Sequence, residues 1–215
     1  MRCTAIVVAG GSGRRFGGPK QFAILNGEVV AARSVSVCRS VADEVILVVP
    51  AGLAADPHGA DRVVVGGETR SASVRAGLAL VDESVDAVLI HDAARPLATE
   101  RLFFSVLAEL ADPSVDGAIA ALGVTDTIKE VSETDGRRHV VATLDRSRLV
   151  AVQTPQVFRT SILRQAHESE PEATDDAALV EAVGGMVIAV PGEVENLKLT
   201  SPRDLDEAER LIERV

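Results

Sequence analysis

A glycine-rich loop with three cations, Val8 to Lys20, is the stretch of this sequence best suited to chemistry. It packs five glycines together with Arg14, Arg15 and Lys20. Glycines let backbone N–H groups approach an anion with no Cβ in the way, and the cations supply positive charge. A plain surface turn after a strand would explain glycines alone, but it would not explain the cations. The loop therefore favours binding of a polyphosphate.

The spacing of this loop excludes two common phosphate loops. No Lys-Ser/Thr pair closes it, as the Walker pattern requires, and glycines at 11, 13, 17 and 18 do not fit the dinucleotide fingerprint. The loop instead resembles the nucleotidyltransferase signature, a strand that leads to Ala/Gly-Gly-x-Gly-x-Arg and then to Pro-Lys. That resemblance implies transfer of a nucleotidyl group from a nucleoside triphosphate to a sugar or polyol phosphate. It does not choose the base or the acceptor.

A second charged cluster, His91 to Pro96, directly follows an apolar run. Asp92 could hold a divalent metal or a substrate hydroxyl, and Arg95 could meet a phosphate. The alternative is an internal Asp–Arg pair that closes a strand end, but the glycine-rich loop favours the functional interpretation. We expect His91 to be structural, because a single histidine is more often a satisfied hydrogen-bonding residue than a base.

Other polar stretches carry weak signals on their own. The glycine turn Gly66 to Val74 could bind a base edge through N–H groups and hydroxyls, but this stretch alone favours a plain turn with an N-cap and no ligand. Lys198 lies on an expected short strand, Asn196 to Thr200, where a solvated lysine is the default. Arg146 and Thr154 are unremarkable by themselves.

Alternating strands and helices must position these groups. Near-continuous apolar runs predict buried parallel strands at residues 4–8, 44–50, 62–65, 87–90, 117–122 and 186–190. Apolar residues at helical spacing predict helices at residues 28–41, 71–81, 99–110, 160–166, 175–183 and 202–214. The alternation predicts an α/β fold, a Rossmann-like, doubly wound and mostly parallel sheet with its site at the carboxyl ends of the strands.

The stretch from Val124 to Gln153 breaks this alternation. Polar and β-branched residues alternate around a Ser-Glu-Thr-Asp-Gly turn at 132–136, which predicts a hairpin-like β-arm that leaves the sheet. A two-stranded ribbon is marginal alone in water, so the arm needs a partner surface, most simply a second copy of the chain. No linker rich in proline, glycine or serine divides residues 1–215, and we expect one domain.

Composition limits the classes of partner. A net charge of −10 and a pI near 4.9 argue against nucleic-acid binding, because no basic field collects phosphates. From the apolar pattern at the start of the sequence and the lack of long apolar runs, we expect neither a signal peptide nor a membrane span. Cys3 and Cys38 lack the spacing of metal ligands and lie in apolar stretches, so we expect buried free thiols and a cytoplasmic protein.

Eight motifs occur in family order along essentially the whole chain. They are the glycine-rich loop with Pro19-Lys20-Gln21, Gly66-Gly67-x-x-Arg70-x-x-Ser73-Val74, His91-Asp92-Ala93-Ala94-Arg95-Pro96, Asp126-Thr127-Ile128-Lys129, Asp145-Arg146, Gln153-Thr154-Pro155-Gln156, Thr174-Asp175-Asp176 and Asn196-x-Lys198-x-Thr200. Together they resemble the 2-C-methyl-D-erythritol 4-phosphate cytidylyltransferase family of the non-mevalonate isoprenoid pathway. One departure is Gly10, where the family commonly has a second alanine.

The resemblance implies transfer of a cytidylyl group from CTP to 2-C-methyl-D-erythritol 4-phosphate, with Mg²⁺, by a homodimer whose arms embrace. It assigns catalytic roles to Arg15, Lys20, Arg146 and Lys198. It places around CTP Ala9, Gly10, Gly11, Gly13, Gly67, Glu68 and Ser73. It places around the acceptor Asp92, Arg95, Thr127 and Thr154. Thr127 and Arg146 would come from the partner's arm, and Asp92 is the candidate metal ligand.

Two alternatives stay open at this point. A cytidylyltransferase acting on ribitol 5-phosphate would share the loop and differ mainly in its contacts with the acceptor. A catalytically inactive nucleotide-binding module would keep only the fold. The combined presence of Arg15, Lys20, Asp92 and Lys198 favours an active enzyme.

Overall fold

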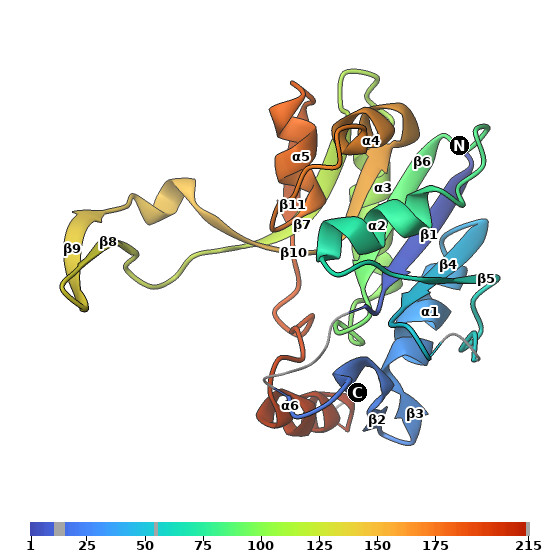
Figure 1. The fold of residues 1–215 in the computed structure, drawn as a ribbon, viewed down its shortest axis with the longest axis horizontal. Coiled ribbons are helices and arrows are strands. Elements are labelled where there is room, and N and C mark those ends of the chain that lie inside the picture. Colours follow the sequence, from blue (N-terminus) through green and yellow to red (C-terminus); the bar gives the residue numbers. More distant parts are fainter. Residues whose placement is uncertain (11–15, 54–55, 214–215) are drawn as a thin grey trace.

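The computed structural model describes residues 1–10, 16–53 and 56–213 of the 215-residue chain. A seven-stranded sheet runs through its centre in the order β11-β7-β10-β6-β1-β4-β5 (Figure 1). These strands are β1 (Cys3–Val8), β4 (Glu44–Val49), β5 (Arg62–Val65), β6 (Ala87–Asp92), β7 (Gly117–Gly123), β10 (Val150–Arg159) and β11 (Val187–Pro191). The α-helices are α1 (Val30–Arg39), α2 (Arg70–Leu78), α3 (Glu100–Glu109), α4 (Thr160–His167), α5 (Asp176–Ala182) and α6 (Pro202–Ile212).

The expected parallel strands are confirmed, because β1 pairs in parallel with β4 and β6, β4 with β5, and β11 with β7. Continuous apolar runs form these strands because helices cover both faces of the sheet. In β4, for example, every residue from Val45 to Val49 is fully buried. The predicted helices are confirmed as well, with ends that differ from the expected ones by a few residues.

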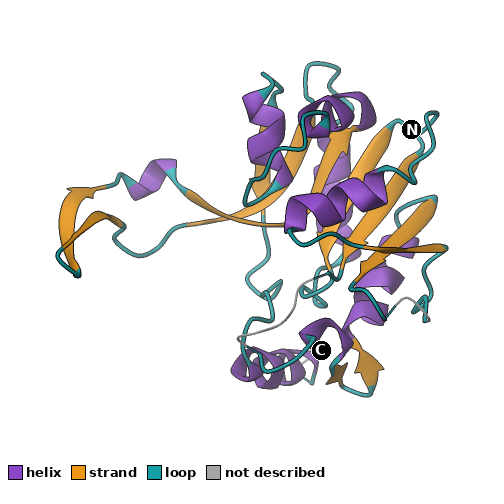
Figure 2. Ribbon diagram, in the orientation of Figure 1, coloured by secondary structure: helices purple, strands orange, loops and turns teal. Residues whose placement is uncertain are grey.

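Helices cover both faces of the central sheet (Figure 2), and each face has its own apolar core. Helices α1 and α3 contribute Val35 and Phe103 to one core, which packs on alternate residues such as Leu47. Helices α2, α4 and α5 contribute Val74 and Leu163, among others, to the core of the other face. The sheet is therefore doubly wound, as predicted. A smaller cluster joins α6 to the short hairpin of β2 (Ile24–Leu25) and β3 (Glu28–Val29) that precedes α1.

Strand β10 is the main departure from the expected architecture. It runs antiparallel between β6 and β7, and it includes Val150 to Gln153, which the sequence pattern assigned to the arm. Its ladder is irregular between Val152 and Gln156, so that Thr154 leaves the regular pairing at this point. The expected strand at Asn196–Thr200 is wrong, since this segment has neither strand nor helix structure.

The β-arm is confirmed as a hairpin outside the main sheet. Strands β8 (Lys129–Thr134) and β9 (Arg137–Thr143) pair only with each other in the described structure, and Figure 1 shows them projecting far from the helices. A short 3-10 helix, η2 (Arg146–Arg148), leads from the arm back to β10. In the described residues, no helix is both long and apolar enough to cross a membrane. Both cysteines are buried free thiols, as expected.

Candidate active site

A cavity of about 1000 Å³ lies at the carboxyl ends of β1, β4, β5 and β6. This is the edge of the sheet at which the alternation of strands and helices predicts a ligand site. The cavity brings together eight of the residues that the family resemblance assigns to the site. They are Ala9, Gly10, Lys20, Gly67, Glu68, Ser73, Asp92 and Lys198.

The other expected site residues fall into three groups. Gly11, Gly13 and Arg15 lie outside the described residues. Thr127 and Arg146 belong to the arm and are exposed, and Arg146 donates a hydrogen bond to the carbonyl oxygen of Thr125. Arg95 and Thr154 lie next to Asp92, where they contact the chain itself.

Gly10 packs closely against helix α2. A Cβ on Gly10 would lie 2.9 Å from the hydroxyl oxygen of Ser73, closer than such contacts normally come. The Ser73 hydroxyl donates to the backbone oxygen of Thr69 at 2.9 Å, which holds it in that position. The end of β1 and the second glycine turn therefore meet as one wall of the cavity.

Lys20 begins a short 3-10 helix, η1 (Lys20–Phe22), and lines the cavity. The next residue, Gln21, is buried, and its side-chain Nε2 donates to the backbone oxygen of Ala9 at 2.5 Å. This bond ties the far end of the glycine-rich loop to the end of β1. Lys20 is thus presented to the cavity by a fixed turn.

Asp92 is the electrostatic centre of the site. Its Oδ2 lies 2.5 Å from the Nζ of Lys198, and its Oδ1 lies 3.4 Å from the Nε of Arg70. Burial would raise the pKa of the Asp92 carboxyl, but the charges of Lys198 and Arg70 outweigh burial and hold this pKa well below its ordinary value. Asp92 is therefore an anion at neutral pH.

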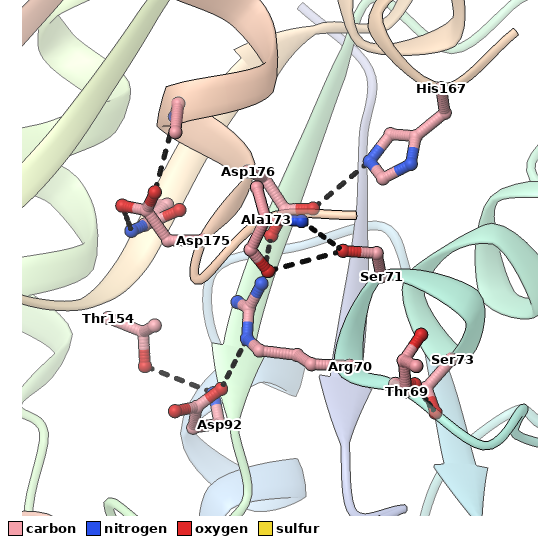
Figure 3. A network of polar contacts seen from close by, with 12 residues as sticks. Thr69, Arg70, Ser71, Ser73, Asp92, Thr154, His167, Ala173, Asp175 and Asp176 are labelled. Carbon is pink, nitrogen blue, oxygen red and sulfur yellow. Dashed lines mark hydrogen bonds and ion pairs between the residues drawn. The ribbon is translucent and has the colours of Figure 1, made fainter. Parts of the chain in front are cut away.

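Arg70 lines the cavity but was not among the expected site residues. Figure 3 shows its guanidinium between Asp92 and Asp176, and its Nη1 lies 2.6 Å from the Asp176 Oδ2. Burial would lower the pKa of Arg70, but the two carboxylates raise it above its ordinary value. The available sequence signal was its place in the second glycine turn, four residues after Gly66. That signal does not say which carboxylates it meets.

His91 is fully buried, and both of its ring nitrogens have partners. Nε2 lies 3.2 Å from the backbone oxygen of Arg95, and Nδ1 lies 3.1 Å from the hydroxyl of Thr154. Burial lowers the pKa of His91 to about 4, so the ring is neutral at pH 7. Because a carbonyl oxygen only accepts, the proton sits on Nε2 and Nδ1 accepts from Thr154. His91 is structural, as its sequence context suggested.

The Thr154 hydroxyl is consequently committed to the chain. It donates to His91 and also accepts a hydrogen bond of 3.0 Å from the backbone N–H of Asp92. Arg95 is similarly engaged, because its Nη1 donates to the backbone oxygen of Asn196 at 2.7 Å. The Nε of Arg95 is buried without a hydrogen-bond partner. These residues brace the segment that carries Asp92 and the one that leads to Lys198.

The described residues do not by themselves make a magnesium site. No group of three or more His, Cys, Asp or Glu side chains gathers among them in a way that could hold a metal ion. Two carboxylates line the cavity, Glu68 and Asp92, and Asp92 already shares its two oxygens between two cations. Mg²⁺ is commonly held by one or two carboxylates together with substrate phosphates and water. A metal here would depend on the phosphates of a bound nucleotide.

Comparison with known proteins places the chain in a family. The family model for IspD, 2-C-methyl-D-erythritol 4-phosphate cytidylyltransferase, matches residues 3–214. The enzyme of that name from Syntrophus aciditrophicus is 39% identical, and the match covers 99% of this chain and 97% of the relative. A bifunctional enzyme IspD/IspF from Anaeromyxobacter sp. is 46% identical, and there the chain spans 58% of the relative's length. The chain thus spans a little over half of the bifunctional relatives.

Solved structures show the same similarity. The crystal structure of 2-C-methyl-D-erythritol 4-phosphate cytidylyltransferase from Thermus thermophilus superposes with a TM-score of 0.82 at 34% identity, and the match covers all of both chains. The bifunctional IspDF from Campylobacter jejuni gives a TM-score of 0.80 at 28% identity, over 96% of this chain and 54% of the larger one.

Proposed function

The chain belongs to the 2-C-methyl-D-erythritol 4-phosphate cytidylyltransferase family, and we therefore propose that it transfers the cytidylyl group of CTP to 2-C-methyl-D-erythritol 4-phosphate. The products are 4-diphosphocytidyl-2-C-methyl-D-erythritol and pyrophosphate. The observation that carries this proposal is the cavity at the strand ends, in which Lys20, Asp92 and Lys198 meet the glycine turn of Gly66 and Gly67.

The reaction is an in-line displacement at the α-phosphorus of CTP. An oxygen of the acceptor phosphate forms the new bond, the bond to the β-phosphate oxygen breaks, and pyrophosphate leaves with that electron pair. A phosphate monoester is already anionic near neutral pH, so the nucleophile needs no general base. The histidine nearest the site, His91, suits this chemistry because it is buried and both of its nitrogens are occupied.

The enzyme's task is to hold two polyanions together and to neutralise the charge that develops at the α-phosphoryl group and on the leaving group. We assign this role to Arg15, Lys20 and Lys198. The cytosine would lie against Ala9, Gly10 and the second glycine turn. Small residues and backbone groups suit a pyrimidine, because a narrow pocket rejects purines by size.

We propose that Mg²⁺ accompanies CTP. When bound, it would neutralise charge on the triphosphate. The chain's own contribution is to keep cations in place beside those phosphates. Asp92 serves this purpose because it forms ion pairs with Lys198 and Arg70 and so holds both cations at the cavity.

We also propose a homodimer formed through the β-arm, with Thr127 and Arg146 of one copy completing the acceptor site of the other. Support comes from the exposure of the arm, where the apolar side chains of Val140 and Val141 are 64% and 59% exposed. An isolated ribbon with such side chains in water is marginal, so a covering surface would stabilise it. A bidentate arginine suits a phosphate acceptor.

Mixing two inactive variants tests the shared site. Arg146→Ala and Lys20→Ala proteins are each expected to be inactive, and heterodimers regain one site with both residues intact. A mixture that stays as inactive as its parents, after verified subunit exchange, would mean that the arm does not complete a neighbour's site.

The buried free thiols Cys3 and Cys38 suit the reducing cytoplasm, which we propose as the enzyme's compartment.

The acceptor and the activity are tested together by measuring pyrophosphate release. We expect turnover with CTP and 2-C-methyl-D-erythritol 4-phosphate, and much slower turnover with ribitol 5-phosphate. Faster turnover with the ribitol compound would reassign the acceptor. No release with either compound would favour an inactive nucleotide-binding module.

A further inference from the structure

A row of paired polar and charged side chains runs from the protein interior to the cavity. His167 Nε2 lies 3.0 Å from Asp176 Oδ1, and the other oxygen of Asp176 contacts Arg70 at 2.6 Å. Arg70 reaches Asp92, which in turn contacts Lys198. Figure 3 shows the inner part of this row, from His167 through Arg70 to Asp92. Its members come from helices α4, α5 and α2, the end of β6 and the segment before α6.

Exposure is low at the inner end of the row and highest at Lys198, and Asp92 is 10% exposed. The side chain of Asp176 is 0% exposed, that of Arg70 is 21% exposed and that of Lys198 is 41% exposed. A carboxylate without water must keep a cation beside it, since an unpaired buried charge is strongly destabilising. Asp176 therefore fixes one side of the Arg70 guanidinium. Only the other side of Arg70 is left for Asp92.

We propose, on the basis of the cytidylyl transfer proposed above, that Asp176 is a positioning residue that acts through Arg70 to set how tightly Asp92 holds Lys198. Arg70 divides its charge between two carboxylates, so Asp92 is only partly neutralised by it and keeps Lys198 at 2.5 Å. If Asp176 were neutral, the whole charge of Arg70 would fall to Asp92. Lys198 would then lose part of its attraction to Asp92.

The position of Lys198 matters because this lysine has to meet a phosphate group during the reaction. Asp92 pre-orients the ammonium at the cavity wall before the substrates bind. A small displacement of a group that stabilises the transition state lowers the rate strongly, even when substrate binding is little changed. A change at Asp176 should consequently appear in kcat rather than in the KM for CTP.

The test compares Asp176→Asn with Glu172→Gln. Both changes turn a carboxylate into an amide of the same shape, and both carboxylates pair with an arginine of helix α2, but Glu172 pairs with Arg75 at the surface. We expect Asp176→Asn to lower kcat by about tenfold with less than about a twofold change in the KM for CTP. Glu172→Gln should keep the wild-type kcat. An unchanged kcat in Asp176→Asn, or an equal loss in both variants, would overturn the inference.

A second readout needs no substrate. The chain has three lysines, Lys20, Lys129 and Lys198, so lysine labelled with ¹³C at Cε gives a simple NMR spectrum. A Lys198→Arg variant assigns the Lys198 signal by its disappearance. Asp176→Asn should shift that signal and leave the Lys129 signal in place, whereas Glu172→Gln should shift neither. A Lys198 signal that does not move would refute the coupling.

This readout separates the inference from the proposed function. A wild-type protein that releases no pyrophosphate would contradict cytidylyl transfer, while the lysine spectrum would still decide whether Asp176 acts on Lys198. If Asp176→Asn does not fold, Arg70→Lys takes its place, because an ammonium lacks the fork that spans two carboxylates. Its matched control is Arg75→Lys, five residues further along α2. A folded Arg70→Lys with the kcat of the wild type would equally overturn the inference.

Discussion

Acidification should destabilise this protein through His91. The ring is fully buried, and it accepts a hydrogen bond at Nδ1 while it donates at Nε2. Protonation at Nδ1 would place a second N–H against the Thr154 hydroxyl and a charge in the core. The folded state therefore binds this proton less readily than the unfolded chain does.

The size of the effect follows from the pKa of His91, which burial lowers from 6.5 to about 4. The unfolded chain takes up the proton below about pH 6.5, whereas the folded protein does so only near pH 4. The free energy of unfolding therefore falls as the pH drops through this window, by about 3 kcal/mol in all and by about 2 kcal/mol at pH 5. The lowered pKa of Asp92 acts in a separate window, since its contribution is lost only below about pH 4.

Urea unfolding at pH 7 and pH 5 measures how much of the free energy of unfolding is lost through protonation of His91. His91→Gln removes the titrating group, and His139→Gln on the exposed arm is the matched control. We expect the wild type and His139→Gln to lose about 2 kcal/mol more than His91→Gln between the two pH values. The comparison uses only the change with pH, so a lower starting stability of His91→Gln does not matter. Equal losses in all three proteins would show that His91 does not resist protonation in the fold.

Three further predictions concern the reaction. Lys20→Ala and Arg15→Ala should each raise the activation free energy by an amount on the order of 3–4 kcal/mol, and so lower the turnover number, with a smaller effect on CTP binding. Weaker CTP binding at an unchanged turnover number would show that the loop only binds the substrate and does not stabilise the transition state. CTP should be used far better than ATP or GTP, and equal use of ATP would contradict a cytidylyltransferase. Asp92→Asn should lower kcat but leave the magnesium concentration for half-maximal rate within about twofold, whereas a large increase in that concentration would identify Asp92 as a metal ligand.

Much of the sheet could be predicted because its strands are buried on both faces. The run Glu44–Val49 is almost entirely β-branched or leucine, and such a run has few alternatives to a buried parallel strand. Strand β10 could not be predicted in the same way. It contains Gln153, Thr154 and Pro155, and a proline inside a run argues against a central strand. Its place between β6 and β7 depends on pairing across more than 60 residues, which no local pattern reveals.

The candidate site was predictable to a similar degree. Glycine turns and charged residues that directly follow strands identify the edge of the sheet, and Lys20, Asp92 and Lys198 do meet there. Local patterns do not show which hydrogen-bond donors and cations are already paired with other groups of the same chain. The sequence places Arg70 only within a glycine turn, yet in the structure it joins the cavity to buried Asp176. Three-dimensional pairing of charges distant in sequence decides such roles.

The pairing around Asp92 also constrains how an acceptor phosphate can be held. A threonine hydroxyl has one proton, and that of Thr154 goes to His91, so Thr154 can offer a phosphate no donor without breaking that bond. Arg95 is also partly engaged, because its Nη1 and Nη2 donate to the backbone oxygens of Asn196 and Val152 and its Nε is buried without a partner. Further positive charge for the phosphate would come from groups able to move toward it. Lys198, half exposed and held by one ion pair, is such a group within the chain. An arginine on the arm of a second copy would be another such group. Because Thr154 and part of Arg95 are already bonded within the subunit, a donor from a second copy is useful, and this supports the proposed dimer.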